Sequence, residues 1–368
     1  MSFKRILITA GGTGGHLYPA QALAQQLVKK GAPVDILFAA GGLAKNRYFD
    51  SQRFPFREIP SSPLLCFNPF QSFRGIKNLM KGIAESLNVI KAYRPDAVVG
   101  FGSYYTVPIL IAARYRKVPI ILHEANSIPG RANQWLSPLA EKVGVHFPFT
   151  SSFFKHKGVE VGLPLREGYD LEAISKQEAL GYYGLSADKR TLLVCGGSQG
   201  ARAINHLIKQ LMTTFKTLSL QVIHLTGDGI EAAELTQSYA SHRIAASVKV
   251  FEPQMQFAWR AADAFIGRAG ASTIAESLEF EVPGILIPYP YATDHHQERN
   301  ADFLVETVKS GWKLLETALS PSELGKRIEQ LFEDSHHVAF RNAIKSYKKR
   351  PGRLNLYELV LDTAKRGR

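Results

Sequence analysis

Short apolar runs alternate with longer amphipathic segments through the first 150 residues of the chain. The runs predict strands over residues 5–10, 34–40, 96–102, 119–125 and 141–147. A helical pattern over residues 20–27 follows the first run. Because strands that alternate with helices are typical of βαβ units, this pattern predicts a parallel sheet.

The same pattern restarts in the second half of the chain. Apolar runs recur at 191–195, 222–227, 248–253, 263–270 and 283–290, and the first leads into a glycine turn and a helix, as in the first half. We therefore predict an α/β fold of two doubly wound, Rossmann-like domains that face each other across a cleft. The expected bounds are 1–163 and 164–340, with a helical segment, 341–368, packing back on the first domain.

The composition bears on the size of the domains and on the cellular compartment of the protein. The chain has 368 residues, of which 45% are hydrophobic, enough for two domains of ordinary size. Cys66 and Cys195 have neither disulfide-like nor metal-like spacing, which favours a reducing compartment. We find no signal-peptide pattern and no apolar run near the ~20 residues of a membrane span.

The formal net charge of +13 is concentrated in the first half of the chain. Residues 1–165 carry 20 Lys and Arg against 8 Asp and Glu, whereas the remainder carries 25 against 24. Such a one-sided excess indicates an anionic partner: a nucleic acid, an anionic membrane surface or a phosphorylated substrate. A merely solvated surface does not predict this asymmetry.

Two glycine-rich turns occupy equivalent places in the two halves. Residues 11–16 read GGTGGH and residues 196–201 read GGSQGA, each between a strand and a helix. Such turns let backbone N–H groups and a helix start approach phosphate, although glycines there also serve close helix packing. Neither turn is a Walker loop. His16 adds a polar group that packing does not require.

Two further polar segments follow in the second half. Residues 268–276, RAGASTIAE, are either a ligand-binding turn or a capped helix start. Residues 294–301, DHHQERNA, place two histidines side by side, which does not suit i, i+4 metal ligands, so we predict a hydrogen-bonding loop and no metal. The chain holds no Asp-x-Asp, which disfavours a metal-bridged diphosphate.

Together these motifs resemble one enzyme family over almost the whole chain. The matching segments are residues 11–20, 123–126, 129–133, 162–166, 196–202, 268–276 and 294–301. They resemble the bacterial family 28 glycosyltransferases of the GT-B type. These enzymes transfer N-acetylglucosamine (GlcNAc), with inversion, from UDP-GlcNAc to the 4-hydroxyl of N-acetylmuramic acid (MurNAc) in undecaprenyl-pyrophosphoryl-MurNAc-pentapeptide, a peptidoglycan precursor.

The resemblance implies a donor site on the second domain and an acceptor site on the first. Ser198 and Arg166 would contact the diphosphate, Glu276 the ribose, and the backbone near Phe251 and Glu252 the uracil. The sugar would be bound by Gln297 and Asn300, with His296 nearby. The other expected substrate-binding residues are Ala271, Ser272, Thr273, Ile274 and Ala275 for the donor, and Thr13, Gly14, Gly15 and Asn126 for the acceptor.

The implied reaction needs a base and no cofactor. His16 is the first choice for the base because imidazole titrates near neutrality, and general-base help is worth ~10²–10⁴ in rate. Glu124 is the reserve. The chain departs from the family pattern at Ala125, where Gln is usual, at Leu163, where Asn is usual, and near Ser103.

A polyprenyl acceptor implies that the enzyme works at a membrane. Residues 60–82 combine apolar side chains with Arg74, Lys77 and Lys81, which predicts docking on the anionic inner leaflet, with burial as the alternative. The loop side chains are Leu64, Leu65, Phe67, Phe70 and Phe73. A stripe at helical spacing is predicted to be core instead: Ile76, Leu79, Met80, Ile83, Leu87 and Ile90.

Other readings of the sequence make distinct predictions. A diacylglycerol glycosyltransferase or a UDP-GlcNAc 2-epimerase shares the two-domain pattern, but the epimerase has no use for a basic, apolar surface. A nucleic-acid-binding protein would explain the charge but leave the glycine turns idle, and no aromatic stacking platform is evident. We therefore expect a peripheral enzyme on the cytoplasmic face of the membrane, with cell-wall synthesis proteins as further partners and no nucleic acid.

Overall fold

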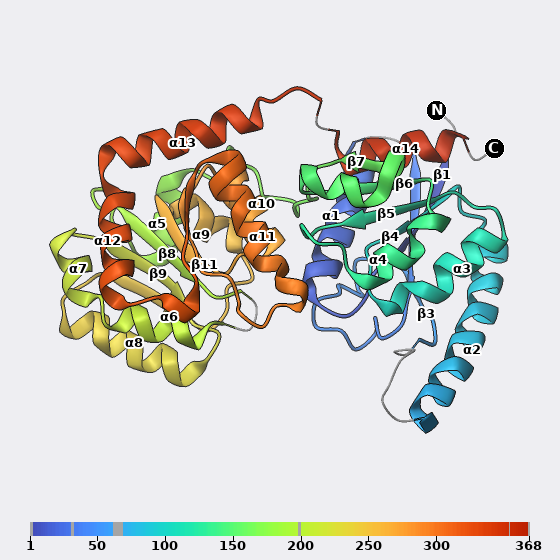
Figure 1. Cartoon of the computed structure of the whole chain (residues 1–368), viewed down its shortest axis with the longest axis horizontal. Coiled ribbons are helices and arrows are strands. Elements are labelled where there is room, and N and C mark those ends of the chain that lie inside the picture. The colour runs from blue at the N-terminus through green and yellow to red at the C-terminus, as the bar shows by residue number, and fades with distance from the viewer. Residues whose placement is uncertain (1–2, 31–32, 62–68, 198–199, 353, 367–368) are drawn as a thin grey trace. The chain divides into compact units, whose positions relative to one another are not determined.

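The computed structural model divides the chain into two compact units, each built on one parallel sheet (Figure 1). It describes residues 3–30, 33–61, 69–197, 200–352 and 354–366, with 69–74 and 366 as backbone only. Unit 1 comprises Met1–Glu167 and Gly352–Arg368, and unit 2 comprises Gly168–Pro351. The predicted class of two Rossmann-like α/β domains is confirmed.

Unit 1 contains a seven-stranded sheet in the order β3-β2-β1-β4-β5-β6-β7. All its strand pairs are parallel. The strands are β1 (Lys4–Thr9), β2 (Val34–Ala40), β3 (Phe56–Glu58), β4 (Ala97–Gly100), β5 (Ile120–Glu124), β6 (Lys142–Val145) and β7 (Gly158–Glu160). The α-helices are α1 (Gly14–Lys29), α2 (Pro69–Tyr93), α3 (Val107–Tyr115), α4 (Arg131–Leu136) and α14 (Leu356–Arg366).

Unit 2 contains a six-stranded parallel sheet in the order β10-β9-β8-β11-β12-β13. The strands are β8 (Thr191–Cys195), β9 (Gln221–Leu225), β10 (Ala246–Lys249), β11 (Ala264–Gly267), β12 (Gly284–Leu286) and β13 (Gly311–Lys313). The α-helices are α5 (Lys176–Tyr183), α6 (Arg202–Lys209), α7 (Met212–Thr217), α8 (Gly229–Ser241), α9 (Met255–Ala261), α10 (Ala271–Glu279), α11 (His296–Asp302), α12 (Pro321–Phe332) and α13 (Asp334–Lys348).

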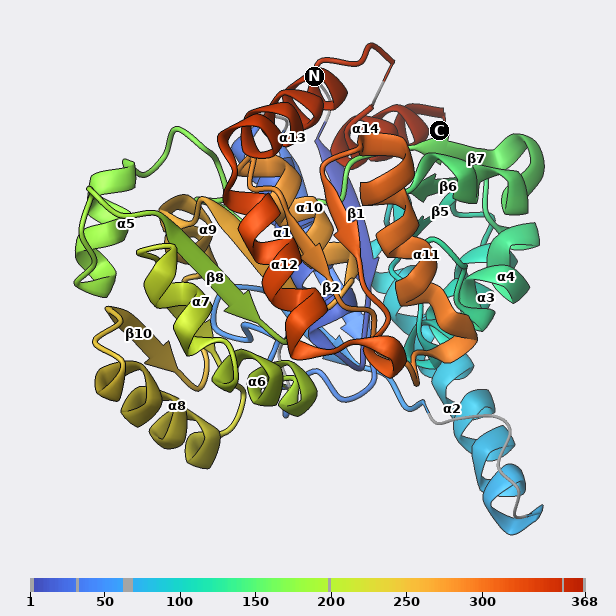
Figure 2. The same cartoon turned by 60° about the vertical axis from the view of Figure 1, so that its left-hand side comes forward.

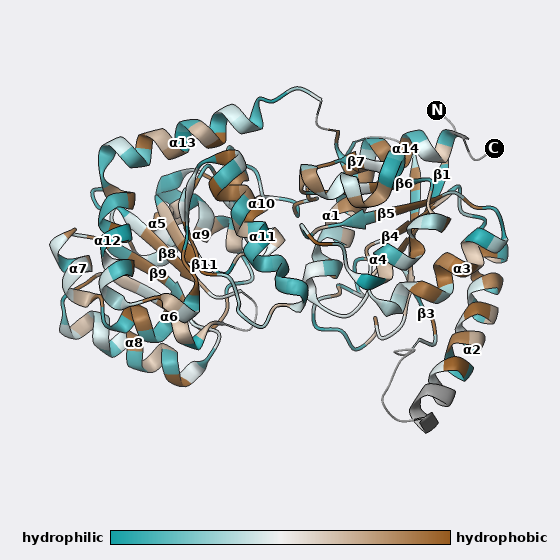
Figure 3. Cartoon of the chain, in the orientation of Figure 1, coloured by the Kyte–Doolittle hydropathy of each residue, from teal (hydrophilic) through white to brown (hydrophobic). Residues whose placement is uncertain are grey.

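The central strands are covered on both faces, which explains their continuous apolar runs. Every residue of β5 and of β8 is buried, and central strands of both sheets are drawn largely in the colour of hydrophobic residues (Figure 3). Each of the ten runs that the sequence pattern indicated overlaps a strand, although the run at 248–253 shares only its first two residues with β10. It missed β3, β7 and β13, which have three residues each and are too short to show a period.

The chain passes between the units after Glu167 and again after Pro351. The expected C-terminal segment, 341–368, is therefore divided: residues 341–351 belong to unit 2 and 352–368 to unit 1. The cause is the length of α13, whose Lys345 and Lys348 lie 3.8 Å from carboxylate oxygens of Glu281 in unit 2. Beyond it, α14 places Leu356 and Val360 in the same buried cluster as β1 and α1.

The predicted core stripe on α2 is wrong for its first half. Ile76 and Met80 are 55% and 63% exposed, whereas Ile90 is 3% exposed. From Gly82 onward the helix lies against the body of unit 1, because a Cβ on Gly82 would stand 2.1 Å from the carbonyl oxygen of Pro60. The earlier turns extend beyond the sheet, as Figures 1 and 2 show, so helical spacing alone did not indicate burial.

Replacing a buried residue of α14 tests whether unit 1 needs the C-terminal helix. Leu356 is 1% exposed, so Leu356→Ala removes packed methyl groups and should lower the free energy of unfolding by about 2–5 kcal/mol. Urea unfolding followed by circular dichroism measures the loss. Leu354→Ala, at a side chain 44% exposed, is the matched control and should have a much smaller effect. Equal losses in the two variants would contradict the packing.

Candidate functional site

The predicted site segments follow strands at the point where each sheet reverses its order. In unit 1, β1 lies between β2 and β4, and in unit 2, β8 lies between β9 and β11. Ligands of doubly wound folds bind beside such switch points, outside the carboxyl ends of the strands. Residues 11–16 follow β1, residues 196–201 follow β8, and residues 268–270 follow β11.

The glycine turn after β1 is shaped by side chains from two neighbouring loops. A Cβ on Gly11 would stand 2.6 Å from Cβ of Tyr105, and Gly12 has a φ of +88°, so the turn needs glycine at both places. Asn46 Nδ2 donates to the carbonyl of Gly12 at 2.9 Å. Sequence reasoning missed Tyr105 and Asn46, because nothing in their spacing links them to this turn.

The helix behind this turn begins without a side-chain cap. Thr13 is the N-cap of α1, yet its side chain accepts no hydrogen bond from the helix, and the first turn has no acidic residue. The N–H groups of the first turn, at Gly14 and Gly15, therefore lack intrahelical partners. A Cβ on Gly15 would meet nothing closer than Thr13 Oγ1 at 3.7 Å, so the approach is open. This geometry suits an anion.

Two histidines adjoin the turn, and burial keeps both uncharged at neutral pH. Burial lowers the pKa of His16 from 6.5, with the backbone carbonyl of Gly11 acting in the opposite direction. Burial, together with the nearby His16, lowers the pKa of His123 to about 3. His123 packs against Phe101 with ring centroids 5.1 Å apart. A neutral imidazole at position 16 is able to accept a proton.

Glu124 organises the loop that follows β5. Its side chain is buried and accepts hydrogen bonds from Asn126 N at 2.9 Å, Gly130 N at 3.0 Å and Asn133 Nδ2 at 2.8 Å. Burial raises its pKa, and these donors oppose that rise. Every one of these contacts uses the carboxylate as an acceptor, so Glu124 fixes the position of Asn126.

In unit 2, a buried arginine holds the loops after β11 and β12 together. Arg268 Nη1 donates to the carbonyls of Ile287 and Pro288, at 3.1 Å each, and pairs with Glu316. Asn300 is fully buried, and its Nδ2 donates to the carbonyl of Ala269 at 3.0 Å. Asn300 thus acts on this loop. Arg268 belongs to the RAGASTIAE motif, but the sequence did not indicate that its side chain bonds to the loop after β12.

The start of α10 contains most of the other residues that were predicted to bind the nucleotide-sugar donor. Gly270 is its N-cap and supplies no side-chain cap. Ala271, Ile274 and Ala275 are buried, while Ser272 and Thr273 are half-buried. Glu276 is also half-buried, and its Oε2 accepts a hydrogen bond of 2.6 Å from Nε1 of Trp259, which is 1% exposed. Sequence reasoning missed Trp259, which fixes the direction of this carboxylate.

The loop after β10 combines a buried carboxylate with an exposed ring. Glu252 is 1% exposed and accepts from Lys249 Nζ at 2.7 Å, Gln254 N at 2.9 Å and Tyr183 OH at 3.1 Å. Burial works to raise the pKa of Glu252, but these donors outweigh it and the pKa is lowered. Phe251 is 51% exposed. The carboxylate therefore shapes the loop, and the adjacent backbone and ring form its surface.

Two predicted features differ in the structure, and a third lies outside the residues that the structure describes. Arg166 belongs to unit 1, where its guanidinium carbon lies 4.5 Å from the ring centroid of Tyr18 on α1. The DHHQERNA segment, predicted as a loop, forms a short 3-10 turn and then α11 from His296, because Gln297 and the residues after it continue helical bonding. Ser198 lies outside the described residues.

Gln297 is nevertheless held in a defined orientation. Its Oε1 accepts a hydrogen bond from the backbone N–H of Tyr289 at 2.9 Å. Among the described residues there is no group of three or more His, Cys, Asp or Glu side chains placed to hold a metal ion. In the same part of the chain, no helix is long and apolar enough to cross a membrane.

Solved glycosyltransferases share this pair of Rossmann-like units. The crystal structure of MurG from Acinetobacter baumannii is 28% identical, with a TM-score of 0.75 over 98% of this chain and 99% of that one. UGT2 of Phytolacca americana is 14% identical with a TM-score of 0.71, covering 99% of each chain, which shows the fold alone. The two units therefore have the fold of these glycosyltransferases.

Two family models identify the glycosyltransferase family. The N-terminal domain of glycosyltransferase family 28 matches residues 6–145, and the C-terminal domain of that family matches residues 191–353. The chain belongs to glycosyltransferase family 28.

Curated relatives agree over nearly the full length. The UDP-N-acetylglucosamine–N-acetylmuramyl-(pentapeptide) pyrophosphoryl-undecaprenol N-acetylglucosamine transferase of Protochlamydia amoebophila is 56% identical over 98% of this chain and 96% of its own. The enzyme of the same name from Bacillus subtilis is 35% identical over 85% of this chain and 89% of its own.

Substitution of Glu124 tests its part in the loop. In Glu124→Gln an amide group replaces one acceptor oxygen and faces an N–H donor, so the free energy of unfolding should fall by about 1–3 kcal/mol. Thermal unfolding of the purified protein measures the change. Glu141→Gln, at an exposed position directly before the neighbouring strand β6, is the matched control. Unchanged stability in Glu124→Gln would show that the carboxylate does not hold the loop.

Proposed function

We propose that this chain transfers GlcNAc from UDP-GlcNAc to the MurNAc of MurNAc-pentapeptide carried on pyrophosphoryl-undecaprenol. The observation that carries the proposal is the 56% identity, over 98% of the chain, to a relative named for this transfer. The geometry supports it independently, because uncapped helix starts occur in both units beside polar groups suited to sugars and phosphates.

The donor binds to unit 2 in this proposal. Glu276, held by Trp259, accepts hydrogen bonds from the ribose hydroxyls, and the loop at Phe251 and Glu252 contacts the uracil. The start of α10, residues 271–275, faces the diphosphate with its N–H groups and the hydroxyls of Ser272 and Thr273. Gln297 binds the sugar, with Asn300 supporting the loop beside it. Ser198 adds a hydroxyl to the diphosphate site.

The acceptor binds to unit 1. Its pyrophosphate lies at the start of α1, where Thr13, Gly14 and Gly15 offer a hydroxyl and N–H groups. Asn126 is presented to the reacting sugars by Glu124. Arg166 lies over Tyr18, whose ring would come within 3.0 Å of a Cβ on Gly14. We therefore assign Arg166 to the phosphates beside this turn rather than to the donor alone.

The reaction is a single displacement with inversion. The 4-hydroxyl oxygen of MurNAc attacks the anomeric carbon of GlcNAc, the bond from that carbon to the UDP oxygen breaks, and the hydroxyl proton passes to His16. Burial lowers the pKa of His16, so its imidazole is neutral at pH 7 and is able to accept this proton. Glu124 acts as a positioning residue. Fixed N–H groups stabilise the charge on the departing diphosphate.

The enzyme works as a peripheral protein on the cytoplasmic face of the membrane in this proposal. Ile76 and Met80 are exposed on the part of α2 that extends beyond the sheet, and Lys77 is exposed between them. The excess of basic residues within 1–165 favours an anionic surface. Leu64, Leu65 and Phe67, first expected to dock there, lie outside the described residues, as do the side chains of Phe70 and Phe73. Cell-wall synthesis proteins are the further partners that this location implies.

Replacement of the base should separate chemistry from donor binding. We expect His16→Ala to lower kcat by ~10²–10⁴, because a base acts in the transition state, and to leave the Kd for UDP-GlcNAc nearly unchanged. Steady-state kinetics and calorimetry measure the two quantities. Glu276→Ala is the contrasting variant and should weaken UDP binding. Near-normal turnover in His16→Ala would remove it from the mechanism, and wild-type protein that forms no GlcNAc-MurNAc product would overturn the proposed function.

Removing the exposed apolar side chains of α2 should weaken membrane docking. We expect Ile76→Ser/Met80→Ser to reduce sedimentation with anionic vesicles about tenfold, because burying each side chain is worth about 1.5–3 kcal/mol when complete. Activity on the polyprenyl acceptor should fall, while activity on a short-chain acceptor in solution should not. Val28→Ser, at a side chain 62% exposed on α1, is the control. Equal loss on both acceptors would contradict docking through α2.

A further inference from the structure

Ser103 holds a backbone conformation that residues with a side chain rarely adopt. It follows Gly102 in the turn after β4 and precedes a short 3-10 turn, η1 (Tyr104–Thr106). Its φ is +73° and its ψ is 152°, a combination that is essentially restricted to glycine and that costs free energy for any other residue. A serine at this place therefore needs a reason in what its side chain does.

Contacts on both sides keep this segment in its strained conformation. The carbonyl of Ser103 accepts hydrogen bonds from the backbone N–H of Thr106 at 3.2 Å and from its Oγ1 at 2.9 Å. Two residues further on, Tyr105 packs between two turns. Its side chain would come within 2.6 Å of a Cβ on Gly11 and within 2.9 Å of a Cβ on Gly41.

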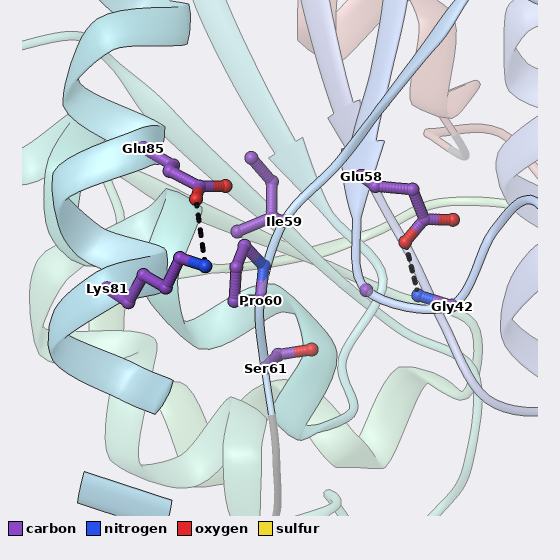
Figure 4. Close-up of a pocket in the computed structure, with 8 residues that line it drawn as sticks. Gly42, Glu58, Ile59, Pro60, Ser61, Lys81 and Glu85 are labelled. Carbon is purple, nitrogen blue, oxygen red and sulfur yellow. Dashed lines mark hydrogen bonds and ion pairs between the residues drawn. The ribbon is translucent and has the colours of Figure 1, made fainter. Parts of the chain in front are cut away.

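The second of these turns is itself fixed by a carboxylate. Glu58, at the end of β3, accepts a hydrogen bond from the backbone N–H of Gly42 at 2.8 Å and another from Ala44, and Figure 4 shows its side chain directed at Gly42. Tyr105 is thus held between this turn and the glycine turn after β1. Ser103 cannot relax its backbone without disturbing that packing.

The hydroxyl of the strained residue lies over the glycine turn after β1. Oγ of Ser103 would stand 3.6 Å from a Cβ on Gly12, whose carbonyl is held by Asn46. Among the described residues this hydroxyl has no hydrogen-bond partner, and it does not cap η1. The side chain therefore contributes nothing to the fold that offsets its strain.

Two buried ring nitrogens beside the same turn also lack partners. Nδ1 of His16 and Nε2 of His123 make no hydrogen bond within the part of the chain that the structure describes. His123 is 2% exposed, interacts electrostatically with His16, and packs against Phe101, two residues before Ser103. Because buried polar atoms are seldom left unpaired in native proteins, these atoms indicate that a polar ligand occupies this turn.

We propose that the Ser103 hydroxyl donates a hydrogen bond to a pyrophosphate oxygen of the acceptor. Gly14 and Gly15 offer N–H groups from the helix after β1, and Ser103 adds a donor from the turn after β4, the neighbouring strand. A glycine at position 103 would be free of strain but would leave that oxygen without this donor. The assignment rests on the proposed function, because it takes the ligand at this turn to be the acceptor's pyrophosphate.

Two variants separate the hydroxyl from the strain. Ser103→Ala removes the hydroxyl and keeps the strained side chain, whereas Ser103→Gly removes both. Each should lower kcat/KM for the acceptor about tenfold and weaken binding of a short prenyl pyrophosphate without sugar by a similar factor, as expected when a hydrogen bond to a charged group is lost. The Kd for UDP should stay nearly unchanged in both. Only Ser103→Gly should raise Tm, by about 2–4 °C.

Lys117→Gly is the matched control. Lys117 also has a positive φ, of +56°, but it is exposed and precedes β5, at the opposite end of the sheet from the glycine turn. This variant should keep the wild-type kcat/KM and the wild-type Kd for the prenyl pyrophosphate.

Three results would overturn the proposal: wild-type protein that binds no prenyl pyrophosphate, an unchanged Kd for it in both serine variants, or a loss confined to Ser103→Ala, which would trace the effect to the backbone. Failure of the proposed function is distinguishable, because wild-type protein would then form no GlcNAc-MurNAc product while calorimetry still measures the prenyl pyrophosphate.

Discussion

The structure depends on backbone N–H groups that its own side chains leave unpaired. Three helices that follow switch-point strands, α1, α6 and α10, begin at Thr13, Ala201 and Gly270 without a side-chain cap. Side-chain caps are found on α5, α8 and α12, at Ser175, Asp228 and Ser320, whereas α3, α4, α7, α9, α11 and α13 also begin without one. What distinguishes α1, α6 and α10 is therefore their place after central strands of the sheets. An uncapped start costs stability, commonly about 1 kcal/mol, and is favourable where an anionic ligand completes it.

Buried polar side chains hold the loops of the candidate site in position. Glu124, Arg268 and Asn300 each bond to the backbone of a loop rather than to solvent, and Trp259 aims the carboxylate of Glu276. Loops without such ties would have to be ordered by the ligand, and that ordering would reduce the binding free energy. The polar residues of the motifs thus divide into those that meet a ligand and those that hold the loops.

The sequence was most informative where a residue acts locally. Apolar runs indicated the long strands and their order of connection, because a strand buried on both faces has a continuous apolar run. Glycine turns indicated the sheet edges. Sequence could not indicate Tyr105 or Asn46, which reach Gly11 and Gly12 from distant loops. It also mistook Ile76 and Met80 for core, since helical spacing is the same whether a helix is covered or extends beyond the sheet.

The return of α14 to unit 1 makes unit 2 an insertion within unit 1. During synthesis, unit 2 is complete once Pro351 has emerged, whereas the buried cluster of unit 1 still lacks Leu356, Leu359 and Val360. Although unit 1 is begun first, it closes its core last, against the usual order in which N-terminal domains fold first. The surface of β1 and α1 that α14 covers therefore stays open while all of unit 2 is synthesised, and a nascent protein is most exposed to chaperones and proteases through that interval.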